Sequence, residues 1–485
     1  MGDTDGRSDF DQATARFVEW FTAADGTRLS SKIRLKDLRS ENAGRGAVAV
    51  GDIEEDEELF AIPRSLVLTA TTSDIPPAVL EPLTETGQWQ PLIVTIIYER
   101  LRYEKSPWHP YFQVLPTKFD SLMFWNPAEL KTLQASAVVD KISRTQAEES
   151  WKEKMIPIML SHPELFPVAG QGESDRTVEL IKLAHVAGSS IMAYAFDIDK
   201  DDDKNDADND SEDEFEDDDE DEPLKGMVPF ADMLNADADR NNARLFQESD
   251  YLIMRSTKQI KAGEQIFNDY GPLPRSDLLR MYGYITDNYA QYDVVEISHD
   301  LLLEVAGKNH GARDAAWLKR AEQLEEIGVI DDGYAIPRPA PAVEELGQAI
   351  PGQLHMLLRA LCMDGTKTPK DAVTINEAAL LQSVLTKRLS EYGTSLEADR
   401  AILEAVAHSE SPQSLIPSDC NKNRFVMALQ VRIGEKEIIH RLIRLCQVHI
   451  EQKNQEITAR STKRQIHDDT DNKPKKAPRK RNARN

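Results

Sequence analysis

Three separated segments of the sequence carry groups suited to binding a ligand. The first is NAGRGA at 42–47, where two glycines flank a long cation and let the backbone approach a ligand closely. The second is VPFADMLN at 228–235, an apolar run that ends in Asp and Asn and so fixes hydrogen-bonding groups at its end. The third is EQIFNDYG at 264–271, followed by RMYGY at 280–284, so that two Tyr-Gly pairs lie twelve residues apart. Backbone, amide and phenol groups are therefore the candidate functional groups of this chain.

Each segment also has a purely structural interpretation when it is taken alone. The glycine-rich segment is compatible with a tight turn at the entry to a strand, the second with a strand that ends in an Asn turn, and each Tyr with a core residue beside a flexible Gly. Two nucleotide-binding motifs are excluded at 42–47. No G-K-[ST] follows, as a Walker loop needs, and no helix opens behind it, as a dinucleotide fingerprint requires.

Short strands are expected to position these segments. AVAVGDI at 47–53 and ELFAIP at 58–63 are apolar runs joined by an acidic turn, which predicts a pair of strands. Three further strands are predicted: one that ends at Phe246, one over Tyr251–Ser256 and one over Gln265–Tyr270. The KAGE turn at 261–264 separates the last two. A short helix over SDLLRMYGY closes this region.

Helices are predicted elsewhere. They are expected at 14–21, 90–104, 128–150 and 178–196, and long helical patterns follow residue 300 up to about 457. The fold class is therefore α+β: a β-rich domain at 15–290 with a helical insert at about 90–195, then an all-helical domain at 300–457.

Charge is distributed unevenly along the 485 residues, whose formal net charge is −26. Residues 197–222 hold 18 acids and two lysines, whereas 459–485 hold ten Lys or Arg and three Asp. We expect an acidic loop at about 197–224 and a basic tail at 459–485, both disordered because they lack apolar residues. No apolar run is long enough to span a membrane, and the acidic start is not a signal peptide. The three widely spaced cysteines exclude a disulfide framework and a cysteine-based zinc site.

The order of the motifs resembles that of the SET-domain protein methyltransferases. G-R-G comes first, then A-D-M-L-N, K-A-G-E-Q-I-F-N-D-Y-G and M-Y-G-Y. WHPYF at 108–112 with LP at 115–116 is similar to an element of the branch that includes the Rubisco large-subunit methyltransferase, and the region after 300 looks like the substrate-binding domain of that branch. VPFADMLNAD is most similar to the fungal ribosomal lysine methyltransferases of this branch, which act on a 60S ribosomal protein.

The resemblance implies a map of site residues. Tyr270 would be the catalytic tyrosine, and Ala195 and Asp197 would touch the protein substrate. No metal is implied. S-adenosylmethionine would be the cofactor, and the residues that would bind it are Ala43, Gly44, Arg45, Tyr194, Asn235, Ala236 and Tyr282.

One departure from the family pattern concerns the segment after Asn235. The branch usually reads Asn-His-Ser where this chain has Asn235-Ala236-Asp237. The change removes a side-chain contact but keeps the backbone N–H of Ala236 that faces the cofactor, so we interpret it as a subfamily trait. Two alternatives stay open: a methyltransferase that modifies a histidine or a non-ribosomal protein, and an inactive SET-fold binding module.

The implied reaction is an in-line methyl transfer to a lysine of a 60S ribosomal protein. It needs alignment and a neutral amine, and a narrow apolar channel beside a positive sulfonium disfavours the ammonium form. The tail KPKKAPRKR at 473–481 indicates nuclear import, and the negative body argues against direct binding to nucleic acid. The acidic loop is either an inert insertion or a steering device for basic substrates. We expect a nuclear monomer with no membrane partner.

Overall fold

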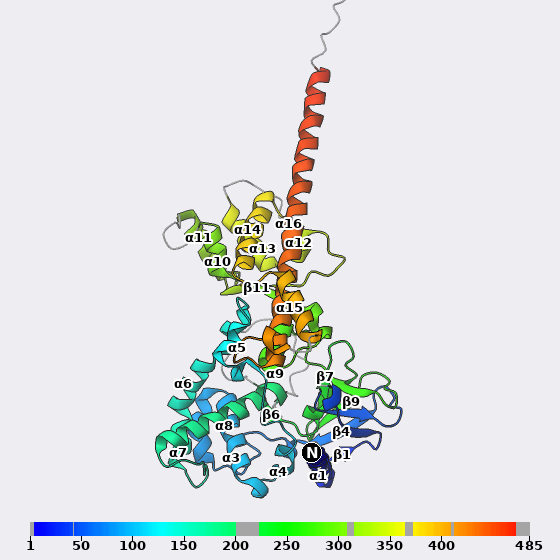
Figure 1. The fold of residues 1–485 in the computed structure, drawn as a ribbon, viewed down its shortest axis with the longest axis vertical. Helices are drawn as coiled ribbons and strands as arrows, with labels where there is room; N and C mark the ends of the chain where they lie inside the picture. The colour runs from blue at the N-terminus through cyan, green and yellow to red at the C-terminus, as the bar shows by residue number, and fades with distance from the viewer. Residues whose placement is uncertain are drawn as a thin grey trace, which may run out of the picture. The chain divides into compact units, whose positions relative to one another are not determined.

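The computed structural model describes residues 4–41, 43–199, 223–307, 315–363, 372–408 and 412–471. The chain separates into two compact units (Figure 1). The first unit comprises Met1–Lys131, Val138–Ala290 and Pro417–Met427. The second comprises Thr132–Ala137, Gln291–Ile416 and Ala428–Asn485. Each unit therefore includes a short segment from the part of the sequence that mainly forms the other unit.

Two four-stranded sheets form the β part of the first unit, in the orders β1-β4-β9-β8 and β2-β3-β10-β7. Every pairing is antiparallel except that of β10 with β7. The strands are β1 (Arg28–Leu29), β2 (Ile33–Asp37), β3 (Arg45–Ala49), β4 (Glu58–Pro63), β7 (Asn235–Ala236), β8 (Ala243–Gln247), β9 (Tyr251–Ser256) and β10 (Gln265–Asn268). Apolar and charged residues alternate along β2, as expected for a strand with one buried face: Ile33 and Leu35 are buried, whereas Arg34 and Lys36 are exposed.

The predicted pairing of 47–53 with 58–63 is wrong, although both segments are strands. β3 pairs with β2 and β10, whereas β4 pairs with β1 and β9 in the other sheet. The eight residues between β3 and β4 are too many for a tight hairpin turn. They carry the chain across between the sheets, and Ile53 forms a bridge with Ile260 on the way.

A third, two-stranded ribbon follows the longest helix of this unit. β5 (Ala195–Ile198) pairs antiparallel with β6 (Leu224–Met227), and Asp197 lies opposite Lys225. The predicted helix over 178–196 therefore ends two residues early, at Tyr194, and the predicted acidic loop is shorter than 197–224. Residues 200–222 lie outside the described residues.

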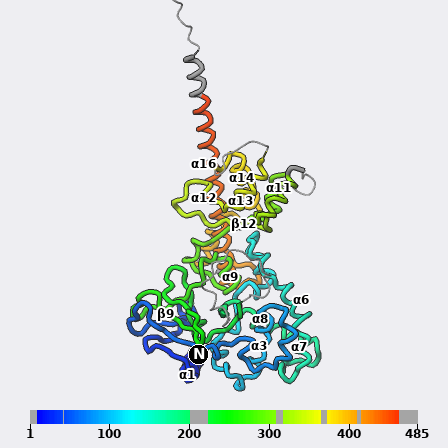
Figure 2. Tube along the Cα trace, turned by 180° about the vertical axis from the view of Figure 1, so that it is seen from behind, coloured from blue at the N-terminus to red at the C-terminus, as the bar shows by residue number. Residues whose placement is uncertain are grey.

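Most helices of the first unit lie between β4 and β5 in the sequence. The helices are α1 (Thr4–Ala23), α2 (Pro77–Leu80), α3 (Trp89–Leu101), α4 (His109–Phe112), α5 (Pro127–Lys131), α6 (Arg144–Lys154), α7 (Ile156–Ser161), α8 (Glu173–Tyr194) and α9 (Arg275–Tyr282). α3 is buried along its length and packs against α8. Figures 1 and 2 show α3, α6, α7 and α8 gathered beside the sheets rather than over them. The single helix predicted at 128–150 is interrupted, and Ser143, with φ of +42°, precedes α6.

Short 3-10 helices of three to six residues connect many of these elements. Within the described residues they are η1 (Arg39–Glu41), η2 (Arg64–Leu66), η3 (Glu81–Thr86), η4 (Tyr103–Lys105), η5 (Leu122–Phe124), η6 (Ala137–Ile142), η8 (Ala231–Met233), η9 (Asp287–Tyr292) and η10 (Pro412–Leu415). η8 matters most for function, because it lies inside the VPFADMLN segment and turns the chain between β6 and β7.

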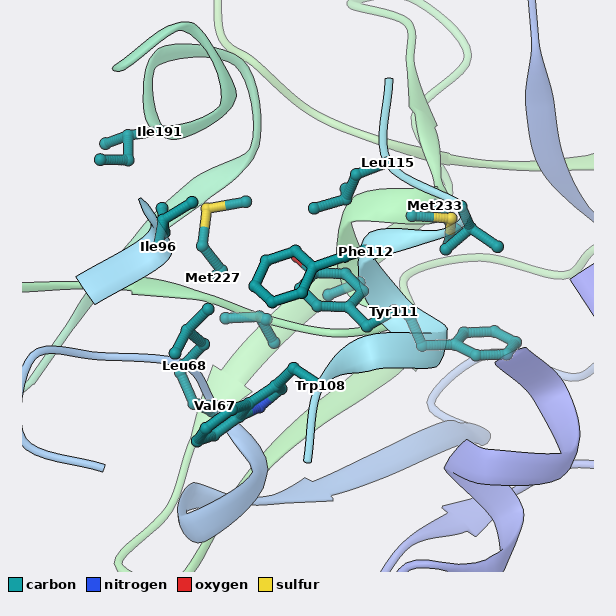
Figure 3. Packing of buried hydrophobic residues seen from close by; sticks show 14 of the residues in the cluster. Val67, Leu68, Ile96, Trp108, Tyr111, Phe112, Leu115, Ile191, Met227 and Met233 are labelled. Atoms are coloured by element: carbon teal, nitrogen blue, oxygen red, sulfur yellow. The ribbon is translucent and has the colours of Figure 1, made fainter. Parts of the chain in front are cut away.

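The core of the first unit is rich in aromatic side chains. Around α4, the residues packed together are Val67, Leu68, Ile96, Trp108, Tyr111, Phe112, Leu115, Ile191, Met227 and Met233 (Figure 3). The Trp108 indole donates a hydrogen bond to the carbonyl of Leu66 at 2.9 Å. Phe230 lies 4.8 Å from Phe60 and 4.9 Å from Phe21, measured between ring centroids. The WHPYF motif therefore anchors the helical insert against the strands.

The second unit is mainly helical, but it is not all-helical as predicted. Its helices are α10 (His299–Val305), α11 (Ala315–Glu326), α12 (Leu346–Ala349), α13 (Gly352–Cys362), α14 (Ile375–Ser390), α15 (Leu396–His408) and α16 (Lys422–Asp471), whose first turns belong to the first unit. A ribbon of β11 (Val294–Ser298) and β12 (Gly333–Pro337) joins them. Leu354, Leu358 and Leu442 are among its fully buried core residues.

A buried charged cluster joins two helices of the second unit. Asp399 of α15 is fully buried and accepts hydrogen bonds from Arg432 at 2.7 Å and Lys436 at 2.5 Å, both on α16. The Thr394 hydroxyl donates a third bond to the same carboxylate. Such a group of charges tolerates burial only because each member is paired.

Two features are absent from the described part of the chain. No helix there has both the length and the apolar composition to cross a membrane. No group of three or more His, Cys, Asp or Glu side chains there is arranged to hold a metal ion.

Candidate active site

One sheet of the first unit brings the three sequence segments together. β10 lies between β3 and β7, so that Ile266 pairs with Ala47 and Phe267 with Asn235. The glycine-rich loop enters β3, the VPFADMLN segment ends in β7, and Tyr270 follows β10 by two residues. Residues separated by more than 200 positions in the sequence are thereby held on neighbouring strands.

The loop that enters β3 is closed by its own backbone. The N–H of Leu38 donates to the carbonyl of Gly44 at 2.7 Å, and the N–H of Ala43 donates to the carbonyl of Leu38 at 3.1 Å. Gly44 has φ of +64°, a conformation that favours glycine. We call the described residues 38–41 and 43–44 the cofactor loop, after their predicted role.

Asn235 lies against the start of β3. Its Nδ2 atom is 2.8 Å from the position that a Cβ on Gly46 would occupy. The same nitrogen is buried and has no hydrogen-bond partner among the described residues. A buried donor without a partner is costly, and a carboxylate is the kind of group that would satisfy it. The site therefore fits the amino-acid end of S-adenosylmethionine, which is the group predicted to bind Asn235.

Four tyrosines gather near the end of β10. The rings of Tyr270 and Tyr282 are stacked, with centroids 4.4 Å apart and planes 7° from parallel. Tyr284 lies edge-on to Tyr282 at 6.2 Å. Burial, together with the nearby phenols of Tyr284, Tyr282 and Tyr194, raises the pKa of Tyr270 well above its usual range. All of these hydroxyls stay protonated near neutral pH, so Tyr270 can form hydrogen bonds but is not a phenolate base.

The two tyrosines predicted to bind the cofactor are each positioned by the end of a helix. Tyr194 is the last residue of α8, and burial raises its pKa to about 12. Tyr282 ends α9, and burial likewise raises its pKa to about 12. Gly283 caps α9 with φ of +77°, and a Cβ there would come within 2.5 Å of the backbone nitrogen of Ser121. Only glycine lets the chain turn so closely against η5 and hold both neighbouring tyrosines.

A buried carboxyl lies close to this cluster. Asp232 of η8 accepts a short hydrogen bond from the Tyr111 hydroxyl, and its other oxygen, Oδ1, has no partner among the described residues. Burial raises the pKa of Asp232 to about 8, and the carboxyl contributes to the raised pKa of Tyr270. Asp232 is therefore largely neutral near pH 7, which limits the charge close to the tyrosines.

The predicted substrate residues lie on the β5–β6 ribbon. Ala195 pairs with Met227, and Asp197 lies opposite Lys225. Lys225 Nζ is 2.6 Å from the Asp197 carboxylate, whose side chain is still 60% exposed. Asp197 is thus already paired, but it is accessible to a basic segment of another protein.

Asp237, where the family usually has Ser, has a structural role. Its carboxylate accepts bonds from the Arg240 side chain at 2.6 Å, from Asn288 Nδ2 at 3.0 Å and from two backbone N–H groups. Burial opposes ionisation, but these bonds outweigh it and lower the pKa. Ala236 of β7 pairs with Asn268 of β10, and β7 is the edge strand of this sheet. The departure from Asn-His-Ser therefore leaves the strand intact.

The structure thus places Ala43 and Gly44 at the entry to β3 and Asn235 and Ala236 in β7 of the same sheet, and it brings Tyr194, Tyr270 and Tyr282 into one cluster that includes Asp232. Their roles in binding and catalysis remain predictions. The Arg45 side chain points elsewhere, toward α1 and Val114. Sequence reasoning missed Tyr284 and the Tyr111–Asp232 pair as members of the site, although all three lie in motifs that it singled out.

Two family models match the chain. The SET domain matches residues 44–271, and the Rubisco LSMT substrate-binding domain matches residues 313–439. The two matches fall in different parts of the chain, and the first begins at Gly44 and contains Asn235 and Tyr270.

Curated relatives agree with these matches. Ribosomal lysine N-methyltransferase 4 of Saccharomyces cerevisiae is 37% identical over 303 residues, which are 61% of this chain and 60% of the yeast protein. N-lysine methyltransferase SETD6 of Rattus norvegicus is 28% identical over 471 residues, with 89% of this chain and 90% of the rat protein aligned. The yeast protein has the higher identity of the two, but the alignment spans less than two thirds of its length.

Solved structures show the same fold. The SET domain of LSMT bound to lysine and AdoHcy superposes with a TM-score of 0.60 at 21% identity, covering 92% of both chains. Rubisco LSMT bound to AdoMet superposes with a TM-score of 0.59 at 20% identity, covering 91% of this chain and 93% of that one.

Proposed function

We propose that this chain, which combines a SET domain with a Rubisco LSMT substrate-binding domain, is an S-adenosylmethionine-dependent protein-lysine N-methyltransferase that methylates a lysine of a 60S ribosomal protein. The observation that carries the substrate class is the 37% identity to the yeast ribosomal lysine methyltransferase. The methyl acceptor is a neutral amine, which the site must select and orient.

S-adenosylmethionine, when bound, supplies a methyl group on a positively charged sulfur. The backbone of Ala43 and Gly44, at the entry to β3, and Nδ2 of Asn235 in β7 would hold it, because β10 lies between these two strands and brings both segments to one sheet. Anchoring the cofactor at one end fixes the direction in which the amine must approach, and alignment of this kind supplies much of the acceleration in a one-step displacement.

Tyr270 orients the lysine amine. Its protonated hydroxyl accepts a hydrogen bond from the amine, and the stacked ring of Tyr282 holds the phenol in place. Burial among four tyrosines and a neutral Asp232 disfavours the ammonium form of an entering lysine, so the amine loses its proton more readily than in water. The tyrosine itself does not need to take that proton.

Charge would help a basic substrate to arrive. Asp197 is exposed at the ribbon from which the acidic segment departs, and ribosomal proteins are basic. Steering by such a segment would raise the association rate and weaken as the salt concentration rises. The segment itself lies outside the described residues.

Nuclear localisation is part of the proposal. The sequence KPKKAPRKR at 473–481, which lies outside the described residues, has the composition of an import signal. A fluorescent fusion should concentrate in the nucleus, and a version without 473–481 should not. An unchanged distribution would remove this part of the proposal.

The substrate is tested with labelled S-adenosylmethionine and 60S proteins from cells that lack this gene. The wild-type protein should label one small basic band, and mass spectrometry should place the methyl group on lysine rather than histidine. If calorimetry shows that the cofactor binds but no band appears, the 60S assignment is wrong and the family assignment stands. If the cofactor does not bind, the chain is a binding module.

A further inference from the structure

Arg45 directly follows the cofactor loop, and its side chain contacts the N-terminal helix α1 and Val114. Its Nε donates to the Thr14 hydroxyl at 3.0 Å, and its Nη1 donates to the carbonyl of Val114 at 2.7 Å. Its guanidinium carbon lies 3.8 Å from the centroid of the Phe10 ring. The Thr14 hydroxyl in turn donates to the carbonyl of Phe10 at 2.9 Å, so the contact surface on α1 is itself ordered.

The other end of the cofactor loop reaches the same ring. The guanidinium carbon of Arg39 lies 4.0 Å from the Phe10 centroid, and Arg39 also pairs with Asp37 at 2.8 Å. Arg39 and Arg45 therefore meet on one aromatic side chain, although Ala43 and Gly44 lie between them in the sequence. The ring joins the two ends of the loop from outside.

The guanidinium groups of Arg39 and Arg45 carry the same charge, so a favourable interaction must hold them together on the Phe10 ring. Burial and the nearby Arg39 lower the pKa of Arg45 to about 10, so both guanidinium groups remain charged at neutral pH and repel each other. The face of an aromatic ring attracts a cation, and the carboxylates of Asp37 and Asp11 offset part of the repulsion. Without the ring, the two arginines would have less reason to converge.

We propose that Phe10 is a positioning residue for the cofactor: by binding both Arg39 and Arg45 it holds Ala43 and Gly44 in the conformation that binds S-adenosylmethionine. Gly44 sits in a left-handed conformation and is flanked by space, since a Cβ there would meet nothing within 4 Å. The loop is closed by its own backbone hydrogen bonds at Leu38 and Ala43, and the ring on α1 restrains it further from outside. This inference rests on the proposed placement of the cofactor beside residues 43–45.

Replacing Phe10 by Leu tests the proposal in the full-length protein. A loop that is in its binding conformation only part of the time binds with a proportionally lower affinity. Losing two cation–π contacts should weaken cofactor binding about three- to tenfold in calorimetry and raise the KM for the cofactor equally. The rate at saturating cofactor should stay within about twofold, because the tyrosine cluster is untouched. Phe10→Tyr, which keeps the ring, should restore the affinity.

Two more variants separate positioning from general stability. Arg39→Ala removes one partner of the ring at an exposed site, so it should fold normally and weaken cofactor binding in the same direction. Tyr251→Leu is the matched control, because Tyr251 holds the guanidinium of Arg28 at 4.9 Å in the other sheet. It should lower stability but leave cofactor affinity unchanged.

The outcomes decide the proposal in each case. Unchanged affinity in both Phe10→Leu and Arg39→Ala, or an equal loss in Tyr251→Leu, would overturn it. Hydrogen exchange provides a readout without cofactor: the amides of Leu38 and Ala43 should exchange faster in Phe10→Leu than in Tyr251→Leu. If the wild-type protein bound no cofactor, the proposed function would fail, and equal exchange rates would separately show that Phe10 does not hold the loop.

Discussion

Tyr270 and Tyr282 are stacked ring on ring, with centroids 4.4 Å apart. The first follows a strand and the second ends a helix, so the stack ties β10 to α9. A phenol that must hold an amine in line cannot swing freely, and a parallel neighbour restricts it. Tyr282 therefore supports the ring of Tyr270, the predicted catalytic residue, in addition to its own predicted contact with the cofactor.

Replacement of Tyr282 separates the ring from its hydroxyl. We expect Tyr282→Leu to lower kcat about tenfold, because an aromatic pair is worth about 0.5–1.5 kcal/mol and the Tyr270 ring would lose its orientation. Tyr282→Phe keeps the stack and should stay within about twofold of wild type in steady-state kinetics. Equal losses in both variants would show that the hydroxyl matters rather than the ring.

Gly46 is expected to control the position of Asn235. A Cβ at this residue would come within 2.8 Å of Asn235 Nδ2 and 2.5 Å of Leu38 Cδ1, so Gly46→Ala must displace the amide that is predicted to anchor the cofactor. Calorimetry should show cofactor binding at least about tenfold weaker, which corresponds to one hydrogen bond to a charged group.

The matched control for Gly46 is Gly51→Ala. The nearest atom to a Cβ on Gly51 is Lys32 Cγ at 3.5 Å, an ordinary contact. Its cofactor affinity should equal that of wild type. Equal affinities in both glycine variants would place the cofactor away from Asn235.

Gly283 and Gly271 share φ of +77° but differ in their surroundings. A Cβ on Gly283 would meet the backbone of Ser121 and Asp120 at 2.5 and 2.7 Å, whereas one on Gly271 would meet nothing within 4 Å. Gly271→Ala should lower the unfolding free energy by about 1 kcal/mol through backbone strain alone, and Gly283→Ala by at least about 2–3 kcal/mol. Urea unfolding of the two variants measures this difference, and equal losses would contradict the close packing at η5.

Asp232 should make stability depend on pH. Its pKa of about 8 in the folded protein exceeds the value near 3.9 expected when unfolded, so the folded state retains a proton that the unfolded chain releases. Its stabilising contribution is complete below about pH 4 and is lost as the pH rises toward 8. Wild type should lose about 2–4 kcal/mol more of its unfolding free energy between pH 5 and pH 8 than Asp232→Asn does. Parallel pH profiles for the two proteins would show that this carboxyl is ionised in the folded state.

Strand positions in the first unit were largely predictable, because periodicity and turn residues are local. The strands expected at Tyr251–Ser256 and from Gln265, with the KAGE turn between them, are confirmed as β9 and β10. Partners were not predictable, as the false pairing of 47–53 with 58–63 shows. β7 has two residues and no periodicity, yet its parallel pairing with β10 is what brings Asn235 to the loop.

The site was predictable only as far as its motifs reach. The order of the motifs indicated Ala43, Asn235 and Tyr270, because a family pattern records contacts between distant segments. The bond from Tyr111 to Asp232 spans 121 residues, and no spacing encodes it. The direction of the Arg45 side chain depends on Phe10, which lies outside the helix predicted at 14–21 and inside the longer α1.

Tyr270 carries the proposed chemistry, so its replacement by Phe is decisive. Methyl transfer from labelled S-adenosylmethionine to 60S proteins should fall at least about 100-fold, as it does when a single group that stabilises a transition state is removed. The thermal unfolding midpoint and the cofactor Kd of Tyr270→Phe should match those of wild type, because the ring and its stack on Tyr282 remain. A Tyr270→Phe protein that labels its substrate at the wild-type rate would show that this hydroxyl does not orient the amine.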